Sequence, residues 1–297
     1  MANTFRIVTL GDSVSWGQGL LEAEKYDALS AAALGVKFPG GVTVQRFAHS
    51  GAVIGAHPVI GNTANGEVPL ARPTIIEQCD SFADSPDTVD LVLLNGGIND
   101  VGVAAILNPF ALVPPLGMRI KIACHDGMLI LLRKVSAKFT KPTCKIRVTG
   151  YYTIISDQSD PLGVHRLLSI HGIAAPAFIG DEDLIIDPVI DRCEEFFADS
   201  TSQLQSAIAD ANDPRIRFVS SGFTEDNAVF AGTPLLFGLD DHLNPQDPAA
   251  APRHVQCDIT HNQPLDILAR EQCYRASAGH PNIAGAVKYR DQILAAL

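Results

Sequence analysis

Residues 8–20, VTLGDSVSWGQGL, contain the corner on which our interpretation of the fold depends. An apolar run at residues 5–10 ends abruptly in Gly11, Asp12 and Ser13, and a helix-like run follows. This pattern predicts a buried strand that turns into a helix. The serine would then stand at the carboxyl end of the strand, where open α/β sheets bind their ligands.

The rest of the chain continues the alternation of strands and helices. Residues 89–95, VDLVLLN, are almost continuously apolar, as is typical of a central parallel strand covered on both faces. We predict strands at 5–10, 42–47, 89–95, 145–152 and 215–220, and helices at 22–35, 128–139, 193–211 and 282–297. The pattern predicts a doubly wound α/β fold, with a five-stranded parallel sheet and helices on both faces.

The chain has 297 residues and shows no internal repeat or long polar linker, which predicts a single domain spanning 1–297. Three segments, 52–74, 153–190 and 221–280, are too long for simple connections and are predicted as long loop insertions. Within the second, residues 163–180 (GVHRLLSIHGIAAPAFIG) are apolar for a loop. Two interpretations stay open: a lid or wall of a substrate pocket, or packing beneath the loop.

The formal net charge of -11 argues against a nucleic-acid partner, because phosphates would be repelled. No apolar run approaches the ~18 residues needed for a membrane-spanning helix. No signal peptide is visible at the N-terminus, which favours a soluble cytoplasmic protein. A secreted protein whose signal peptide has been removed is the alternative, and the sequence indicates no oligomeric state.

Six cysteines are compatible with three disulfides, but a long chain without a signal peptide favours free buried thiols. Cys257 and Cys273 flank a loop-like region and are the first pair to test. Residues 254–261, HVQCDITH, and the nearby His242 contain metal-ligand residue types, but without the tight doublets typical of zinc sites. We therefore predict no metal and no cofactor.

The serine of the opening stretch needs a base before it can act as a nucleophile. Alone, Gly-Asp-Ser is a weak signal, because Asp or Ser often caps a helix after a strand. Three further stretches follow predicted strand ends or open the last helix: AHSGAVIG with Gly51, NGGIND with Asn99, and GHPNIAGA with His280. Donors converging beside a hydroxyl are what an acyl-transfer site requires.

In this order, GDSVSWG, SGA, GIND and HPNIAGAVKY resemble the four sequence blocks of the SGNH (GDSL) hydrolase family. The resemblance extends from Gly11 to Tyr289 and implies a flavodoxin-like three-layer α/β/α sandwich and hydrolysis of esters. It implies that Ser13 is the nucleophile and that His280 is the general base. It further implies an oxyanion hole formed by the N–H groups of Ser13 and Gly51 and by the Asn99 side chain.

One position departs from this pattern. Where the family usually has an aspartate, three residues before the histidine, this chain has Ser277. An orienting group fixes the histidine tautomer and stabilises the imidazolium. Three hypotheses stay open: a backbone carbonyl holds the ring, the Ser277 hydroxyl does so, or Asp240 or Asp241 reaches in from the long loop.

These observations predict a metal-independent serine ester hydrolase, similar to carboxylesterases and lipases, that acts on a small-molecule or lipid ester. A carbohydrate O-acetyl esterase is an alternative, as is a phospholipase or thioesterase. An alternative from another class is an inactive relative that serves as a flavodoxin-like binding module.

Overall fold

The computed structural model describes residues 4–55, 57, 66–111, 113–173, 185–239 and 247–297. Its centre is a five-stranded sheet in the order β2-β1-β3-β4-β5, and every neighbouring pair is parallel. The strands are β1 (Phe5–Leu10), β2 (Val42–Arg46), β3 (Leu91–Leu94), β4 (Lys145–Thr149) and β5 (Ile216–Val219). This order is that of flavodoxin-like sheets, so the predicted fold class is confirmed.

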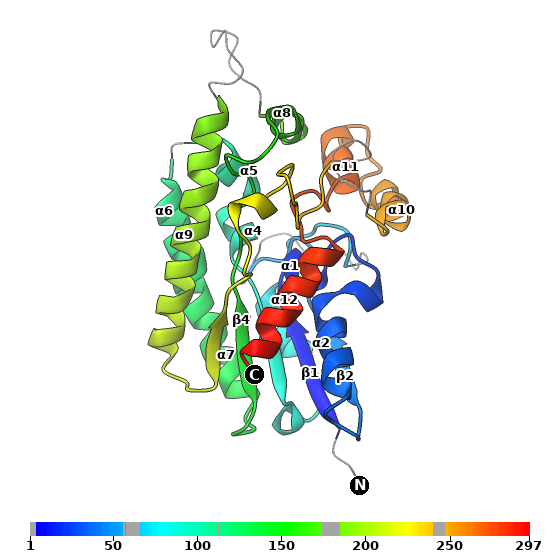
Figure 1. The fold of residues 1–297 in the computed structure, drawn as a ribbon, viewed down its shortest axis with the longest axis vertical. Coiled ribbons are helices and arrows are strands. Elements are labelled where there is room, and N and C mark those ends of the chain that lie inside the picture. The colour runs from blue at the N-terminus through cyan, green and yellow to red at the C-terminus, as the bar shows by residue number, and fades with distance from the viewer. Residues whose placement is uncertain (1–3, 56, 58–65, 112, 174–184, 240–246) are drawn as a thin grey trace.

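Helices cover both faces of the sheet and complete three layers (Figure 1). One face carries α2 (Tyr26–Gly35) and α12 (Ile283–Ala295), and the other carries α3 (Ile75–Ser81), α7 (Met128–Lys138) and α9 (Ile186–Ala211). All four residues of β3 are buried between the two layers. This explains why the strand is uninterruptedly apolar rather than alternating.

Some boundaries differ from the predicted ones. The predicted helix at 22–35 is a 3-10 turn, Glu22–Glu24, followed by α2, and α9 begins at Ile186 rather than near 193. The other helices are α1 (Ser13–Trp16), α4 (Ile98–Val101), α5 (Val103–Leu107), α6 (Leu116–Ile120), α8 (Pro161–Ile170), α10 (Ala250–Thr260) and α11 (Ile267–Tyr274). Further 3-10 turns span Pro86–Thr88 and Glu225–Asn227, and a π-helical segment spans Lys121–Gly127.

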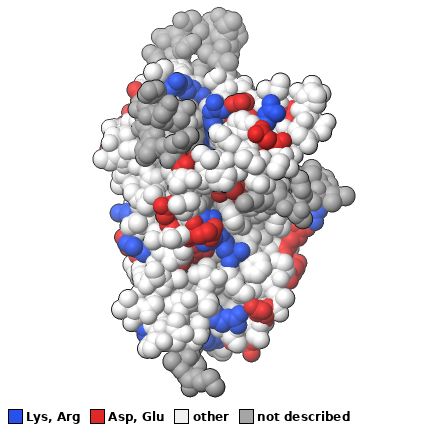
Figure 2. All heavy atoms as spheres, turned by 90° about the vertical axis from the view of Figure 1, so that its right-hand side faces the viewer, with Lys and Arg blue, Asp and Glu red and all other residues white. Residues whose placement is uncertain are grey.

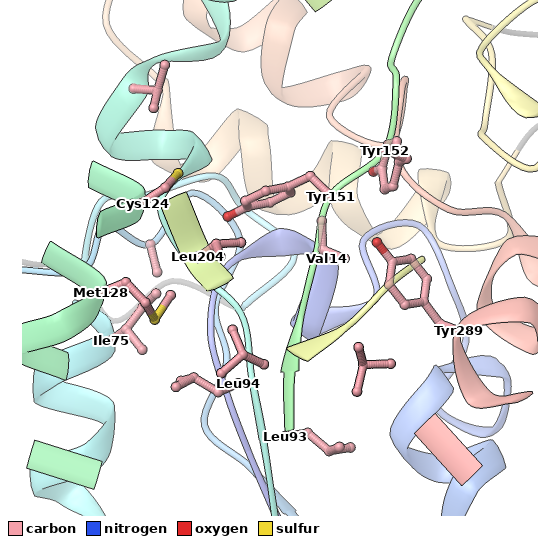
Figure 3. Packing of buried hydrophobic residues seen from close by; sticks show 14 of the residues in the cluster. Val14, Ile75, Leu93, Leu94, Cys124, Met128, Tyr151, Tyr152, Leu204 and Tyr289 are labelled. Carbon is pink, nitrogen blue, oxygen red and sulfur yellow. The ribbon is translucent and has the colours of Figure 1, made fainter. Parts of the chain in front are cut away.

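Two tyrosines after β4 extend the core toward both helical layers. Figure 3 shows Tyr151 pointing to the side of Cys124 and Tyr152 pointing to the side of Tyr289. The ring of Tyr151 lies 5.4 Å from that of Phe196 in α9, and the ring of Tyr152 lies 6.4 Å from that of Tyr289 in α12. Aromatic pairs at these distances are stabilising, so the end of β4 is fixed from both faces.

The second and third of the predicted long insertions contain helices. α8, α10 and α11 lie beyond the carboxyl ends of the strands, at the top of Figure 1. The Gln272 side chain of α11 donates a hydrogen bond to the Ile170 carbonyl of α8 (3.2 Å). These three helices form what we call the cap.

A disulfide joins Cys257 of α10 to Cys273 of α11, with the two Cα atoms 5.8 Å apart. The expectation of free thiols is therefore wrong for this pair, which was the first pair to test. The other four cysteines are buried and free. α10 and α11 are thus connected covalently across the small loop between them.

The surface carries charges of both signs. On the face drawn in Figure 2, basic and acidic side chains are interspersed rather than gathered by sign. None of the helices within the described ranges combines the length and the apolar character needed to cross a bilayer.

Candidate active site

The corner after β1 is fixed by its glycine and by an amide clamp. Gly11 has φ +148°, and a Cβ at this position would lie 2.8 Å from the Asn95 carbonyl oxygen, so a side chain is excluded. The Gln78 side chain of α3 accepts a hydrogen bond from the Gly11 N–H (2.8 Å) and donates one to the Gly11 carbonyl (3.0 Å). The turn that leads to Ser13 is therefore held in one conformation by the Gln78 side chain.

Ser13 is the first residue of α1, and its hydroxyl lies beside His280. The His280 Nε2 to Ser13 Oγ distance is 2.7 Å, although 267 positions separate the two residues in the sequence. Asp12 caps the helix by accepting a hydrogen bond from the Val14 N–H (2.9 Å). Aspartate at this position is a strong helix N-cap, and the capped turn presents the Ser13 hydroxyl to the imidazole.

His280 lies in the turn before α12, and its main chain is held on both sides. The Phe237 N–H donates to the His280 carbonyl (2.7 Å), and the Gly279 N–H donates to the Phe237 carbonyl (2.8 Å). Burial lowers the pKa of His280 to about 4, although the neighbouring carbonyls of Ala278 and Ser277 oppose this effect. The ring is therefore neutral near pH 7 and can accept a proton.

Gly51 and Asn99 line the same cavity as Ser13 and His280. Gly51 has φ +78°, and a Cβ there would lie 2.6 Å from the Leu70 nitrogen, so only glycine fits. Asn99 Nδ2 donates one hydrogen bond to the Ala52 carbonyl (3.0 Å). A carboxamide nitrogen carries two hydrogens, which leaves a second N–H for another acceptor.

The sequence reasoning missed Tyr151, which connects two of these loops. Its hydroxyl donates to Asp12 Oδ2 (2.8 Å) and accepts from the Ile98 N–H (3.0 Å). Burial raises the pKa of Asp12 to about 6, while the hydrogen bonds from Val14 and Tyr151 counteract it. The turn that carries Ser13 and the loop that carries Asn99 therefore share one buried hydrogen-bonded chain.

The three hypotheses on the orienting group have different outcomes. The Ser277 hydroxyl donates to Asp247, so it does not hold the imidazole directly. Among the described residues, His280 Nδ1 has no hydrogen-bond partner, and backbone carbonyls of the preceding turn are its polar neighbours. Asp240 and Asp241 lie outside the described residues.

A cavity of about 300 Å³ opens from the Ser13 hydroxyl toward the cap. Much of its wall is apolar and comes from α4, α5 and α8 and from the loop after β4. These apolar residues include Ile98, Val103, Leu107, Ile154, Leu167 and Ile170. Both interpretations of segment 163–180 apply to α8, because Leu167 and Ile170 line the cavity while Val164 and Leu168 pack in the core. Residues 174–180 lie outside the described residues. Trp16 does not line this cavity; its indole donates to Glu67 (2.7 Å).

Those candidate metal ligands that lie in the described ranges do not come together. In the part of the chain that the structure describes, no group of three His, Cys, Asp or Glu residues is placed to hold a metal ion. Cys257 is in the disulfide, and the ring of His254 stacks on Tyr274 at 4.4 Å. His242 lies outside the described residues.

Comparison with known proteins finds distant structural similarity. No model of a protein family matches the chain, and no curated protein matches it either. Similar solved structures include a lipase from a goat rumen metagenome (TM-score 0.47, 14% identity, covering 94% of this chain and 99% of that chain). A carbohydrate acetylesterase from Sinorhizobium meliloti has a TM-score of 0.45 and 12% identity, covering 99% of this chain and 100% of its own. An acetylxylan esterase from Geobacillus stearothermophilus has a TM-score of 0.44 and 13% identity, covering 99% and 94%.

Proposed function

We propose that this chain is a serine ester hydrolase of the SGNH type, with Ser13 as nucleophile and His280 as general base. The observation that carries the proposal is the 2.7 Å distance between His280 Nε2 and Ser13 Oγ. A hydroxyl becomes a competent nucleophile when a neutral base within hydrogen-bond reach accepts its proton. The lowered pKa of His280 keeps that base neutral at pH 7.

The reaction takes place in two halves. Ser13 Oγ attacks the ester carbonyl carbon while its proton moves to His280 Nε2. The tetrahedral intermediate collapses to an acyl-enzyme, and the alcohol leaves with the proton that His280 returns. Water then attacks the acyl-enzyme, with His280 again as base, and the carboxylic acid is released.

Stabilisation of the oxyanion is assigned to three donors around the cavity. These are the N–H groups of Ser13 and Gly51 and the second amide hydrogen of Asn99. Each donor of such a hole contributes typically about 10²–10³ in kcat. All three residues line the cavity that contains the Ser13 hydroxyl, which supports this assignment.

An acyl or lipid ester is favoured over an acetylated sugar. The apolar wall that α5 and α8 contribute offers few hydrogen-bond partners for sugar hydroxyls, and buried apolar surface favours hydrocarbon. A carbohydrate O-acetyl esterase, a phospholipase or thioesterase and a binding module are the competing assignments. The enzyme assignments differ in the substrate that is cleaved, and the binding module cleaves none.

Labelling by a fluorophosphonate probe tests the proposal. We expect stoichiometric labelling of the wild type, cleavage of p-nitrophenyl esters, and loss of both in Ser13→Ala. Ser169→Ala, which alters an exposed serine of α8, is the matched control and keeps both. A folded wild type that neither labels nor cleaves any ester would instead indicate a binding module.

A further inference from the structure

Three charged side chains are buried together beneath the turn that carries His280. Arg253 is only 1% exposed, and it donates to Glu67 Oε1 (2.9 Å) and to both carboxylate oxygens of Asp247 (3.0 and 2.8 Å). Desolvating each charge costs several kcal/mol, and the mutual attraction in such a group often only offsets that cost. We call these three residues the buried triad.

One side of the buried triad holds the turn before His280. The Arg253 guanidinium donates through Nε and Nη2 to the Tyr274 carbonyl (3.1 and 2.8 Å). The Ser277 hydroxyl donates to Asp247 Oδ2 and lies 3.4 Å from Arg253 Nη2. The His280 N–H in turn donates to the Ser277 carbonyl (2.8 Å). Both ends of the segment 274–277 are therefore tied to the triad.

The opposite side holds the turn that follows the nucleophile. Glu67 accepts from the Trp16 indole (2.7 Å), the Gln18 side chain (2.8 Å) and the Gly19 N–H (2.8 Å). The helix of Ser13 and the turn of His280 thus contact a single buried group of charges. Their relative placement, and with it the distance between the two reacting atoms, depends on that group.

The imidazole needs support on its second nitrogen. When His280 takes the Ser13 proton, the ring becomes a cation whose Nδ1–H requires an acceptor. The backbone carbonyls of Ala276, Ser277 and Ala278 lie close enough to the ring to raise its pKa against the larger effect of burial. Where these carbonyls point depends on how the turn is held.

We propose that Asp247 is the positioning residue for His280, and that it acts by anchoring Ser277 and thereby the turn carbonyls around the imidazole. The proposal rests on the proposed function. Asp247 is 8% exposed and is placed by both Arg253 and Ser277, so its carboxylate can fix the Ser277 side chain in one orientation. It does not touch the reacting atoms, and its effect reaches them through Ser277.

The test compares Asp247→Asn, Ser277→Ala and their combination on a p-nitrophenyl ester. Outer-shell partners that orient metal-ligating histidines are typically worth about 10–100-fold in activity, and by analogy we expect a loss of this size in kcat for Asp247→Asn, with KM within about twofold. Ser277→Ala is expected to lose a similar factor. Because both residues act through one contact, the double variant should lose no more than the worse single variant.

Two further variants separate positioning from folding. Ser277→Thr keeps the hydroxyl and is expected to restore most of the activity that Ser277→Ala loses. Asp87→Asn, at an exposed aspartate in the 3-10 turn Pro86–Thr88 before β3, is the matched control and leaves kcat unchanged. If Asp247→Asn does not fold, the comparison of Ser277→Ala with Ser277→Thr decides the proposal.

The outcomes distinguish this proposal from the proposed function. A wild type that is not labelled by a fluorophosphonate overturns both. A labelled wild type with Asp247→Asn within threefold of its kcat overturns only the role of Asp247. Losses that multiply in the double variant also overturn that role, as does a Ser277→Thr variant that restores nothing.

Discussion

At the scale of single residues, the protonation of His280 controls the reaction. Burial lowers its pKa from 6.5 to about 4. Because the base must be neutral to accept the Ser13 proton, kcat/KM for an uncharged ester should stay level from pH 7 to about pH 5. It should fall about tenfold per pH unit below the pKa of the ring. A pH–rate profile with a stopped assay measures this.

The control for this prediction is the folded state at each pH, followed by circular dichroism. A His280 pKa below the unfolded value of 6.5 also means that the folded state binds fewer protons than the unfolded state in this range. Its contribution to stability is thus present above pH 6.5 and is lost as the pH falls toward 4. An acid limb in kcat/KM centred between pH 6 and 7 would contradict the lowered pKa.

The residues predicted from local sequence and those missed differ in how far their partners lie along the chain. Ser13, Gly51, Asn99 and His280 stand in short stretches at predicted strand or helix ends, and the structure places all four around one cavity. Asp247 contacts a residue 30 positions away, and the contact of Glu67 with Arg253 spans 186 positions. Such pairs leave no local pattern.

At the scale of secondary structure, the predicted elements have a recognisable hydrophobic pattern and the missed ones do not. β3 was predictable because a buried parallel strand is continuously apolar, and β2 because it is rich in β-branched residues and alternates. α10 was not, because its buried side is formed by Ala250, Arg253 and Cys257. A stripe that contains an ion-paired arginine and a disulfide cysteine carries no hydrophobic signal, although its spacing is helical.

α8 provides a test of chain-length selectivity. Leu167 is buried and lines the cavity, whereas Leu162 of the same helix is 65% exposed and does not line it. Leu167→Trp adds volume to the cavity wall and leaves less room for a long acyl chain. We expect kcat/KM for p-nitrophenyl octanoate to fall by about tenfold or more relative to the acetate ester, since several CH₂ groups of about 0.8 kcal/mol each lose their site.

Leu162→Trp is the control and should leave the ratio of octanoate to acetate activity unchanged. Equal losses of both esters in Leu167→Trp would mean that the variant damages the catalytic groups rather than the acyl site. An unchanged ratio in Leu167→Trp would show that the acyl chain does not extend toward α8.

At the scale of the whole molecule, the cavity lies between the sheet-end loops and the cap. Its walls combine Val103 and Leu107 from α5 with Leu167 and Ile170 from α8. The alternation of strands and helices predicts the sheet, but the seating of the cap depends on the disulfide, the Gln272 hydrogen bond and the buried triad. An acyl or alkyl chain that fills the cavity would therefore contact both the sheet-end loops and the cap.

Because the alkyl chain of a bound inhibitor would contact both parts, its length should change the melting temperature of the protein. The cavity of about 300 Å³ has room for about ten groups the size of a water molecule, which is roughly 30 Å³ each. A hexyl fluorophosphonate on Ser13 buries about five more CH₂ groups than a methyl one, which is up to about 4 kcal/mol. For a chain of 297 residues that difference corresponds to up to about 6 °C in Tm. Differential scanning fluorimetry of stoichiometrically labelled protein measures it, and equal Tm values for the two adducts would place the alkyl chain outside the cavity.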